Sequence, residues 1–242
     1  MAKSIAIIPA RGGSKRILRK NIKEFCGKPL IAYSIEKTLE SKLFDKVIVS
    51  TDDDVIANIA KKLGAEIPFI RPQNLSDDFT TIEDVVKHAI EWLKAKGETF
   101  EFECTVYATA PFLQSKYLIE GYNILKKSTA IHVFSATSMP FPIQRTFKIN
   151  NKGRCEMFTP QFYKARSQDL DEAYQDAGQF YWTKLDKISN EIMFGKDSIP
   201  VILPRHLVQD IDTPEDWQQA ELMYKVLQKN KYILKTEENE NR

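Results

Sequence analysis

The chain has 242 residues, enough for one domain with a sizeable core or for one domain with a small subdomain. Hydrophobic residues make up 43% and charged residues 28%, and 35 basic against 33 acidic residues leave a net charge of +2. This near balance argues against binding of nucleic acid or of a membrane through bulk charge. Any anionic ligand must therefore be held by a local cluster of cations.

The cysteines Cys26, Cys104 and Cys155 are far apart and form no CxxC pair. This spacing argues against a zinc site or a disulfide framework and fits a reducing compartment. No window approaches 18 apolar residues, and the first residues lack the pattern of a signal peptide. We therefore expect a cytoplasmic protein without a transmembrane helix.

Strand and helix patterns alternate along the first 137 residues. Apolar runs predict buried strands at residues 4–9, 46–50, 66–69, 103–109 and 131–137. Helical spacing and capping residues predict helices at residues 30–40, 51–63, 80–96 and 115–127. This alternation predicts βαβ units and an α/β fold with a mostly parallel sheet.

Residues 139–182 interrupt the alternation. Pro140, Pro142, a turn at residues 151–153 and many aromatic and polar residues indicate an inserted lobe rather than another βα unit. A strand at residues 198–203 and a helix at residues 213–228, capped by Thr213, follow it. We divide the chain into an α/β core (1–138), the lobe (139–182), a return to the core (183–228) and a tail (229–242), of which residues 235–242 are predicted to be disordered.

A basic, glycine-containing loop follows the first strand. Its glycines let the backbone approach a ligand, and it lies at the carboxyl end of a strand, where open α/β sheets bind their ligands. The loop matches neither the Walker A pattern nor GxGxxG, and the alternative is a solvated basic turn. Strand, glycines and charge together favour a polyphosphate site, with the residues Arg11, Gly12, Gly13, Lys15, Arg16, Arg19 and Lys20.

Two carboxylates, Asp210 and Asp212, precede the predicted helix cap at Thr213. If the backbone is extended here, both side chains point to the same side and suit a hard cation such as Mg²⁺. Asp212 could equally be a helix cap, and the spacing alone leaves both interpretations open.

Several motifs occur together along the chain. They are IIPARGGSKRxxxKN at 7–21, FxRP at 69–72, TAP at 109–111 and QDIDTPEDW at 209–217. In combination they resemble the CMP-sialic-acid synthetases (acylneuraminate cytidylyltransferases), over the chain up to about residue 228. The segments PFPIQR at 140–145, RSQDL at 166–170 and DAGQFYW at 176–182 look like the pseudaminic acid branch of that family.

The resemblance implies a Rossmann-like nucleotide-diphospho-sugar transferase fold and a homodimer whose lobe reaches over the partner's site. It implies that CTP and pseudaminic acid, a nonulosonic acid, give CMP-pseudaminic acid and pyrophosphate, with Mg²⁺ as cofactor. It implies catalysis by Lys20, Arg11 and Asp210, and Mg²⁺ binding by Asp210 and Asp212. Nucleotide contacts are expected from Arg11, Gly12, Gly13, Ser14, Lys15, Lys20, Asn21, Arg71 and Thr81.

Sugar recognition requires a cation for the carboxylate and polar groups for the N-acyl arms. The candidates are Tyr107, Arg145, Arg166, Gln168, Asp176 and Gln179, and for those in the lobe a polar dimer interface is an equal alternative. The chain departs from the family pattern at Leu18 and Ala108, where proline is usual. At Tyr107 it departs from a sugar-contacting Gln of the neuraminic acid enzymes, which supports a different nonulosonic acid.

Three alternatives stay open. The same reaction could act on N-acetylneuraminic or legionaminic acid, or the chain could be a nucleotide-sugar-dependent glycosyltransferase, whose metal acids usually follow a middle strand. An inactive nucleotide-binding regulator is a third, against which Lys20, Asp210 and Asp212 argue. The aspartates at residues 52–54 are interpreted as a helix cap, and the aromatic run at residues 180–182 as core or dimer contacts.

Overall fold

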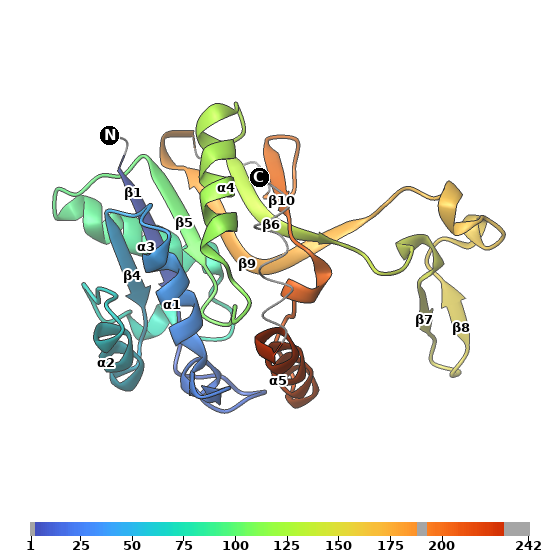
Figure 1. Ribbon diagram of the computed structural model, residues 1–242, viewed down its shortest axis with the longest axis horizontal. Coiled ribbons are helices and arrows are strands. Elements are labelled where there is room, and N and C mark those ends of the chain that lie inside the picture. Colours follow the sequence, from blue (N-terminus) through green and yellow to red (C-terminus); the bar gives the residue numbers. More distant parts are fainter. Residues whose placement is uncertain (1–2, 188–192, 230–242) are drawn as a thin grey trace.

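The computed structural model describes residues 3–187 and 193–229 (Figure 1). A six-stranded sheet consists of β1 (Ser4–Pro9), β4 (Lys46–Ser50), β5 (Phe102–Val106), β6 (His132–Ser138), β9 (Tyr174–Lys184) and β10 (Ser198–Ile202). The strand order is β10-β6-β9-β5-β1-β4. β1 runs parallel to β4 and β5, and β6 parallel to β10, whereas β9 runs antiparallel to both of its neighbours. The predicted mostly parallel α/β sheet is therefore confirmed.

Helices cover both faces of this sheet: α1 (Leu30–Glu40), α2 (Asp54–Lys62), α3 (Ile82–Ala95), α4 (Ser115–Lys127) and α5 (Pro214–Lys229). The alternation of side chains along β1 shows why helices are needed on both faces of the sheet. Ala6 and Ile8 pack into the larger core, which α1, α2, α4 and α5 complete, while Ile5 and Ile7 pack with α3. Both sides of β1 are buried, which is why its sequence is a continuous apolar run.

Side-chain caps fix the beginnings of α2 and α3. Asp53 accepts hydrogen bonds from Val55 N and Ile56 N at the start of α2, so the predicted acidic cap is confirmed at this residue. Thr81 and Asp84 form a capping box at α3. Each cap satisfies backbone N–H groups that the helix leaves free.

The predicted strand at residues 66–69 is wrong. The structure has a single bridge there, between Ile48 and Glu66. Pro68 offers no N–H to continue a ladder along β4. Beyond it, Arg71 N donates to Thr51 O at 2.8 Å, so the segment returns to the end of β4 and carries Arg71 with it.

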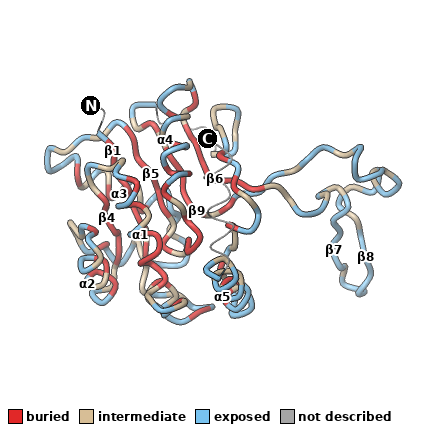
Figure 2. Tube along the Cα trace, in the orientation of Figure 1, coloured by how far each residue is buried: buried red, intermediate tan, exposed pale blue. Residues whose placement is uncertain are grey.

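Residues 139–173 project from the sheet and carry the hairpin of β7 (Phe147–Ile149) and β8 (Cys155–Met157), as Figure 1 shows. The hairpin is almost entirely exposed (Figure 2). The chain then returns along β9, although residues 174–182 of this strand were predicted to belong to the lobe. Phe180 and Trp182 are fully buried in the core, as the aromatic run predicted. Gly178 and a register shift interrupt the alternation at the start of β9, so the sequence hides this strand. Whether the lobe is a separate unit stays a prediction.

A short hairpin of β2 (Glu24–Phe25) and β3 (Lys28–Pro29) precedes α1. The predicted disordered tail at residues 235–242 lies outside the described residues. Across residues 3–187 and 193–229, the helices lack the length and apolar character that a bilayer span requires.

Candidate active site

A cavity of about 540 Å³ lies at the carboxyl ends of β1 and β5. This is the edge at which open α/β sheets bind ligands. The basic loop after β1, residues 107–109 after β5 and the segment leading into α3 form its walls. Six residues that were predicted to contact the nucleotide line it: Arg11, Ser14, Lys15, Lys20, Asn21 and Arg71.

The basic loop is held by the beginning of α2. Gly12 N donates to Asp52 Oδ1 at 2.9 Å, and a Cβ on Gly12 would lie 2.7 Å from Asp53 Oδ2. Arg19 in turn donates to both carboxylate oxygens of Asp53, at 2.9 and 3.0 Å. The packing therefore favours glycine at position 12, since with a larger residue either the loop or the Asp53 side chain must shift.

The structure brings the basic loop and the distant acidic pair together. Lys20 Nζ donates to Ile211 O at 2.6 Å and lies 3.1 Å from Asp212 Oδ1. Arg16 Nη1 lies 3.0 Å from Asp212 Oδ2. Lys20 and Arg16 also line the cavity, whereas Asp210 and Asp212 do not. Asp212 therefore lies beside the cavity, next to two cations from the other end of the chain.

Asp212 is not the cap of α5. Thr213 and Asp216 make that cap, because Asp216 N donates to Thr213 Oγ1 at 3.2 Å and Thr213 N to Asp216 Oδ2 at 2.7 Å. Ile211 is fully buried, whereas its neighbours Asp210 and Asp212 are exposed and half-buried, which is the alternation expected of an extended segment. This removes the capping alternative.

The donor chemistry of Asp210 and Asp212 fits a hard cation. Burial, followed by the charge of Asp212, raises the pKa of Asp210 above its ordinary value. A divalent ion would offset this repulsion, and Mg²⁺ often takes only one or two protein carboxylates besides phosphate oxygens. In the described part of the chain no group of three or more His, Cys, Asp or Glu residues is placed to hold a metal.

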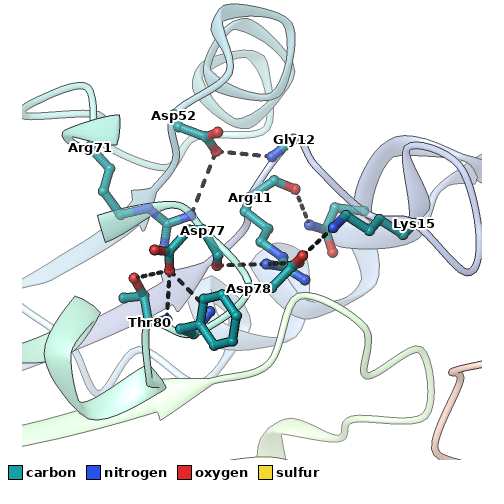
Figure 3. A network of polar contacts seen from close by, with 10 residues as sticks. Arg11, Gly12, Lys15, Asp52, Arg71, Asp77, Asp78 and Thr80 are labelled. Carbon is teal, nitrogen blue, oxygen red and sulfur yellow. Dashed lines mark hydrogen bonds and ion pairs between the residues drawn. The ribbon is translucent and has the colours of Figure 1, made fainter. Parts of the chain in front are cut away.

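Arg71 is a buried cation with unsatisfied donors. Its residue is 4% exposed, its Nη2 lies 3.6 Å from Asp52 Oδ1, and Nε and Nη2 have no hydrogen-bond partner (Figure 3). Burial is the main cause that lowers the pKa of its guanidinium. Because unpaired buried donors are costly, and Arg71 lines the cavity, these groups favour a ligand that supplies acceptors.

Sequence reasoning missed Asp77, Asp78 and Thr80, which line the cavity beside the basic loop. Arg11 Nη1 donates to Asp77 O at 2.7 Å and lies 2.9 Å from Asp78 Oδ1 (Figure 3). Nothing in the polar run at residues 76–80 distinguishes it from an ordinary loop. The predicted contact Thr81 does not line the cavity, since its hydroxyl is paired with Asp84 in the cap of α3.

Tyr107 and Asp176, two sugar candidates, are linked through Tyr181. Tyr107 lines the cavity, and its ring centroid lies 5.0 Å from that of Tyr181. The hydroxyl of Tyr181 donates to Asp176 Oδ2 at 2.5 Å. Burial raises the pKa of both tyrosines, so both remain protonated hydrogen-bond donors. Tyr181 was expected to make only core or dimer contacts, and the structure connects it to the cavity wall.

The other sugar candidates lie elsewhere. Gln179 is 3% exposed and its Nε2 donates to Leu207 O at 2.5 Å, because β9 carries it into the core. Arg145 donates to Ala165 O and Arg166 Nε to Asp169 Oδ2 within the lobe. Neither arginine nor Gln168 lines the cavity. The predicted sugar set therefore does not come together within one chain.

Comparison with known proteins identifies the family. Residues 5–194 match the family model described as "Cytidylyltransferase". The chain belongs to the cytidylyltransferase family. A pseudaminic acid cytidylyltransferase of Campylobacter jejuni is 46% identical over 225 residues, which cover 93% of this chain and 97% of that protein. An N-acylneuraminate cytidylyltransferase of Escherichia coli is 31% identical over 90% of this chain and 51% of that protein.

Solved structures agree on the fold. A CMP:2-keto-3-deoxy-manno-octonic acid synthetase complexed with CTP superposes with a TM-score of 0.65 at 15% identity, covering 92% of this chain and 98% of that chain. The 4-diphosphocytidyl-2C-methyl-D-erythritol synthase of Anaerococcus prevotii superposes with a TM-score of 0.62 at 19% identity, covering 93% and 99%. The expected nucleotidyltransferase enzyme class and family resemblance are thus confirmed for this cytidylyltransferase.

Proposed function

We propose that this cytidylyltransferase joins CTP to pseudaminic acid, forming CMP-pseudaminic acid and releasing pyrophosphate. One observation carries the proposal for the chemistry: Lys20 and Arg16 of the basic loop contact Asp212 of the acidic pair at the edge of one cavity. The choice of sugar is supported by the 46% identity to the Campylobacter jejuni enzyme over nearly the whole chain. Tyr107 also supports this choice, because it lines the cavity and stands where the neuraminic acid enzymes have a sugar-contacting Gln.

In this reaction the anomeric hydroxyl of the sugar acid attacks the α-phosphorus of CTP, and the bond to the β-phosphate breaks. Lys20, whose amine is fixed by Ile211 O, would stabilise the negative charge that grows on the transferred phosphate. Arg11 and Lys15 would hold the departing pyrophosphate, and the free donors of Arg71 would bind the nucleoside end. Catalysis then comes from position and charge.

Asp210 and Asp212 would hold Mg²⁺. When bound, the ion would supply positive charge beside the reacting phosphate. The two carboxylates would orient it, and Lys20 and Arg16 would hold Asp212 in place from the loop side. These roles rest on the donor chemistry and the family resemblance.

We also propose a homodimer in which the lobe of one subunit completes the cavity of the other. Arg145, Arg166 and Gln168 lie away from the cavity of their own chain, as described above. The lobe exposes large apolar side chains that a partner would cover, namely Phe141, Phe147, Ile149, Phe158 and Tyr163. The cytoplasmic location stays a prediction.

A sugar-panel assay tests the proposal. CTP and Mg²⁺ are incubated with pseudaminic, N-acetylneuraminic and legionaminic acids, and pyrophosphate release is measured. We expect kcat/KM for pseudaminic acid to exceed the others by at least about tenfold, roughly 1.4 kcal/mol.

Other outcomes would contradict the proposal. Highest activity on another acid would show that this acid is the substrate. CTP binding without release on any acid would favour an inactive regulator. Transfer from a nucleotide sugar without pyrophosphate would favour a glycosyltransferase. The variant Asp210→Asn/Asp212→Asn serves as the inactive control.

A further inference from the structure

The cations of the basic loop already have an anionic partner within the chain. Asp78 Oδ1 lies 2.9 Å from Arg11 Nη1, and Asp78 Oδ2 accepts a hydrogen bond from Lys15 Nζ (Figure 3). Asp78 lies in the segment between Leu75 and α3, and it lines the same cavity as the two cations. A polyphosphate that used Arg11 and Lys15 would have to take the place of this carboxylate.

The neighbouring residues Asp77 and Asp78 have different roles. The carboxylate of Asp77 faces its own loop, where Oδ1 accepts hydrogen bonds from Phe79 N at 3.0 Å, Thr80 N at 2.8 Å and Thr80 Oγ1 at 2.7 Å. Among the described contacts, the carboxylate of Asp78 pairs with Arg11 and Lys15 alone. Asp77 therefore holds the shape of the loop, and Asp78 can leave its partners without unfolding it.

The charge state of Asp78 suits an exchange of anions. Hydrogen bonding by Lys15, and then by Arg11, lowers the pKa of Asp78 below its ordinary value, so this carboxylate is ionised throughout the neutral range. Both ion pairs are partly open to solvent: the side chains of Arg11 and Asp78 are 37% and 39% exposed. Exposed pairs are weak enough for a polyphosphate to displace them, and strong enough to reduce its net affinity.

We propose that Asp78 is an internal counter-anion that competes with polyphosphate for Arg11 and Lys15 and, by re-forming these pairs, promotes the release of pyrophosphate. The inference rests on the proposed function, because it needs the triphosphate to use the basic loop. It predicts a selective effect. Ligands whose phosphates contact Arg11 and Lys15, such as CTP and pyrophosphate, compete with Asp78. CMP, which lacks the β- and γ-phosphates, does not.

Equilibrium binding to the full-length protein tests the proposal, with inorganic pyrophosphate, CTP and CMP as the probes. The variant Asp78→Asn removes the charge and keeps the shape of the side chain. The matched control is Glu120→Gln, which makes the same charge change at an exposed residue of α4. We expect Asp78→Asn to bind pyrophosphate and CTP about three- to tenfold more tightly at low salt, and CMP within about twofold. The control should match the wild type, and high salt should reduce the difference.

Turnover gives a second readout. Added pyrophosphate should inhibit Asp78→Asn at a concentration lower by the same factor, and Asp78→Ala should behave alike if both fold, as thermal unfolding will show. Suppose that the wild type binds CTP but that neither variant binds pyrophosphate more tightly than the wild type. This result would refute the competition by Asp78 and leave the proposed function intact. A wild type that binds neither CTP nor pyrophosphate overturns both.

Discussion

The basic loop and the projecting lobe differ in how their residues are held in place. Gly12, Arg19 and Lys20 of the loop are fixed by contacts to α2 and to residues 211–212 of the same chain. The lobe, in contrast, makes most of its contacts within itself and exposes large side chains such as Phe141 and Tyr163. On the proposed function, the nucleotide half of the site would therefore be built within one chain, whereas the sugar half would need the lobe of a second chain. Substitutions in the two regions should thus have separable effects.

The largest effect is expected at the junction of the loop with the acidic pair. Lys20→Ala should lower kcat by at least about 100-fold, roughly 2.7 kcal/mol of barrier, because the amine serves the charge of the transition state. The KM for CTP should change far less. Steady-state kinetics measures both, and Lys61→Ala, exposed on α2, controls for loss of one cation. A kcat within about tenfold of wild type would refute the role of Lys20.

The packing of the loop against α2 can be broken with one methyl group. Gly12→Ala places a Cβ 2.7 Å from Asp53 Oδ2, so the loop or the Asp53 side chain must shift. We expect a loss of about 1–3 kcal/mol in the free energy of unfolding and weaker CTP binding. Gly13→Ala is the matched control, because a Cβ there meets nothing within 4 Å, and its stability should change by less than about 0.5 kcal/mol. Equal losses in both variants would contradict this account.

The core at the amino end of β5 should show a pH dependence of its own. Glu103 on β5 is 2% exposed, and burial raises its pKa to about 8. Between its ordinary value of 4.5 and 8 the folded state holds a proton that the unfolded state has lost, so stability falls as pH rises through this window. The slope is up to about 1.4 kcal/mol per pH unit. Glu103→Gln, which resembles the protonated form, should remove it.

Denaturant unfolding at pH 5, 6.5 and 8 measures this slope for the wild type and for Glu103→Gln. A matched exposed change, Glu120→Gln on α4, should leave the slope as it is in the wild type. If Glu103→Gln unfolds with the wild-type slope, Glu103 is ionised in the folded protein. The buried group would then be paired in a way that the structure does not show.

The lobe should give the smallest and most selective effect. Arg166→Ala should raise the KM for the sugar acid by about tenfold, roughly 1.4 kcal/mol, and leave the KM for CTP and the melting temperature unchanged. Arg154→Ala, in the exposed turn between β7 and β8, is the control. An equal rise in the KM for CTP would contradict the prediction that substitutions in the lobe affect only the sugar acid.

Mixing subunits sharpens the same comparison. If the lobe serves the partner's cavity, a mixture of Arg166→Ala and Lys20→Ala subunits contains sites with an intact Lys20 and an intact Arg166. At sugar concentrations well below the KM of Arg166→Ala, activity should then exceed that of either parent after co-refolding or co-expression. Activity equal to the average of the parents would place Arg166 in its own subunit's site, or outside any site.

Several elements could be predicted because local signals agreed. Apolar runs bounded by turn residues gave β1 and β4 at their observed ends, and helical spacing gave α1 and α4 at theirs. The segment at 66–69 failed because one proline outweighed its apolar pattern, and the start of β9 was hidden by Gly178 and a register shift. Among the site residues, Arg11, Lys15 and Lys20 could be predicted because they lie in a basic segment that contains glycines. No pattern in the sequence indicated Asp78 or Tyr181.

By itself, the sequence determined the chemistry of each end of the site: a cationic glycine loop behind a buried strand, and two carboxylates before a helix. Such features depend on residues close together in the chain, where turn, cap and alternation rules apply. Only the tertiary structure decided that Lys20 meets Asp212 and that Asp78 pairs with Arg11 and Lys15. These contacts join residues dozens to almost two hundred positions apart. The packing of helices on the sheet fixes them, and no local pattern records that packing.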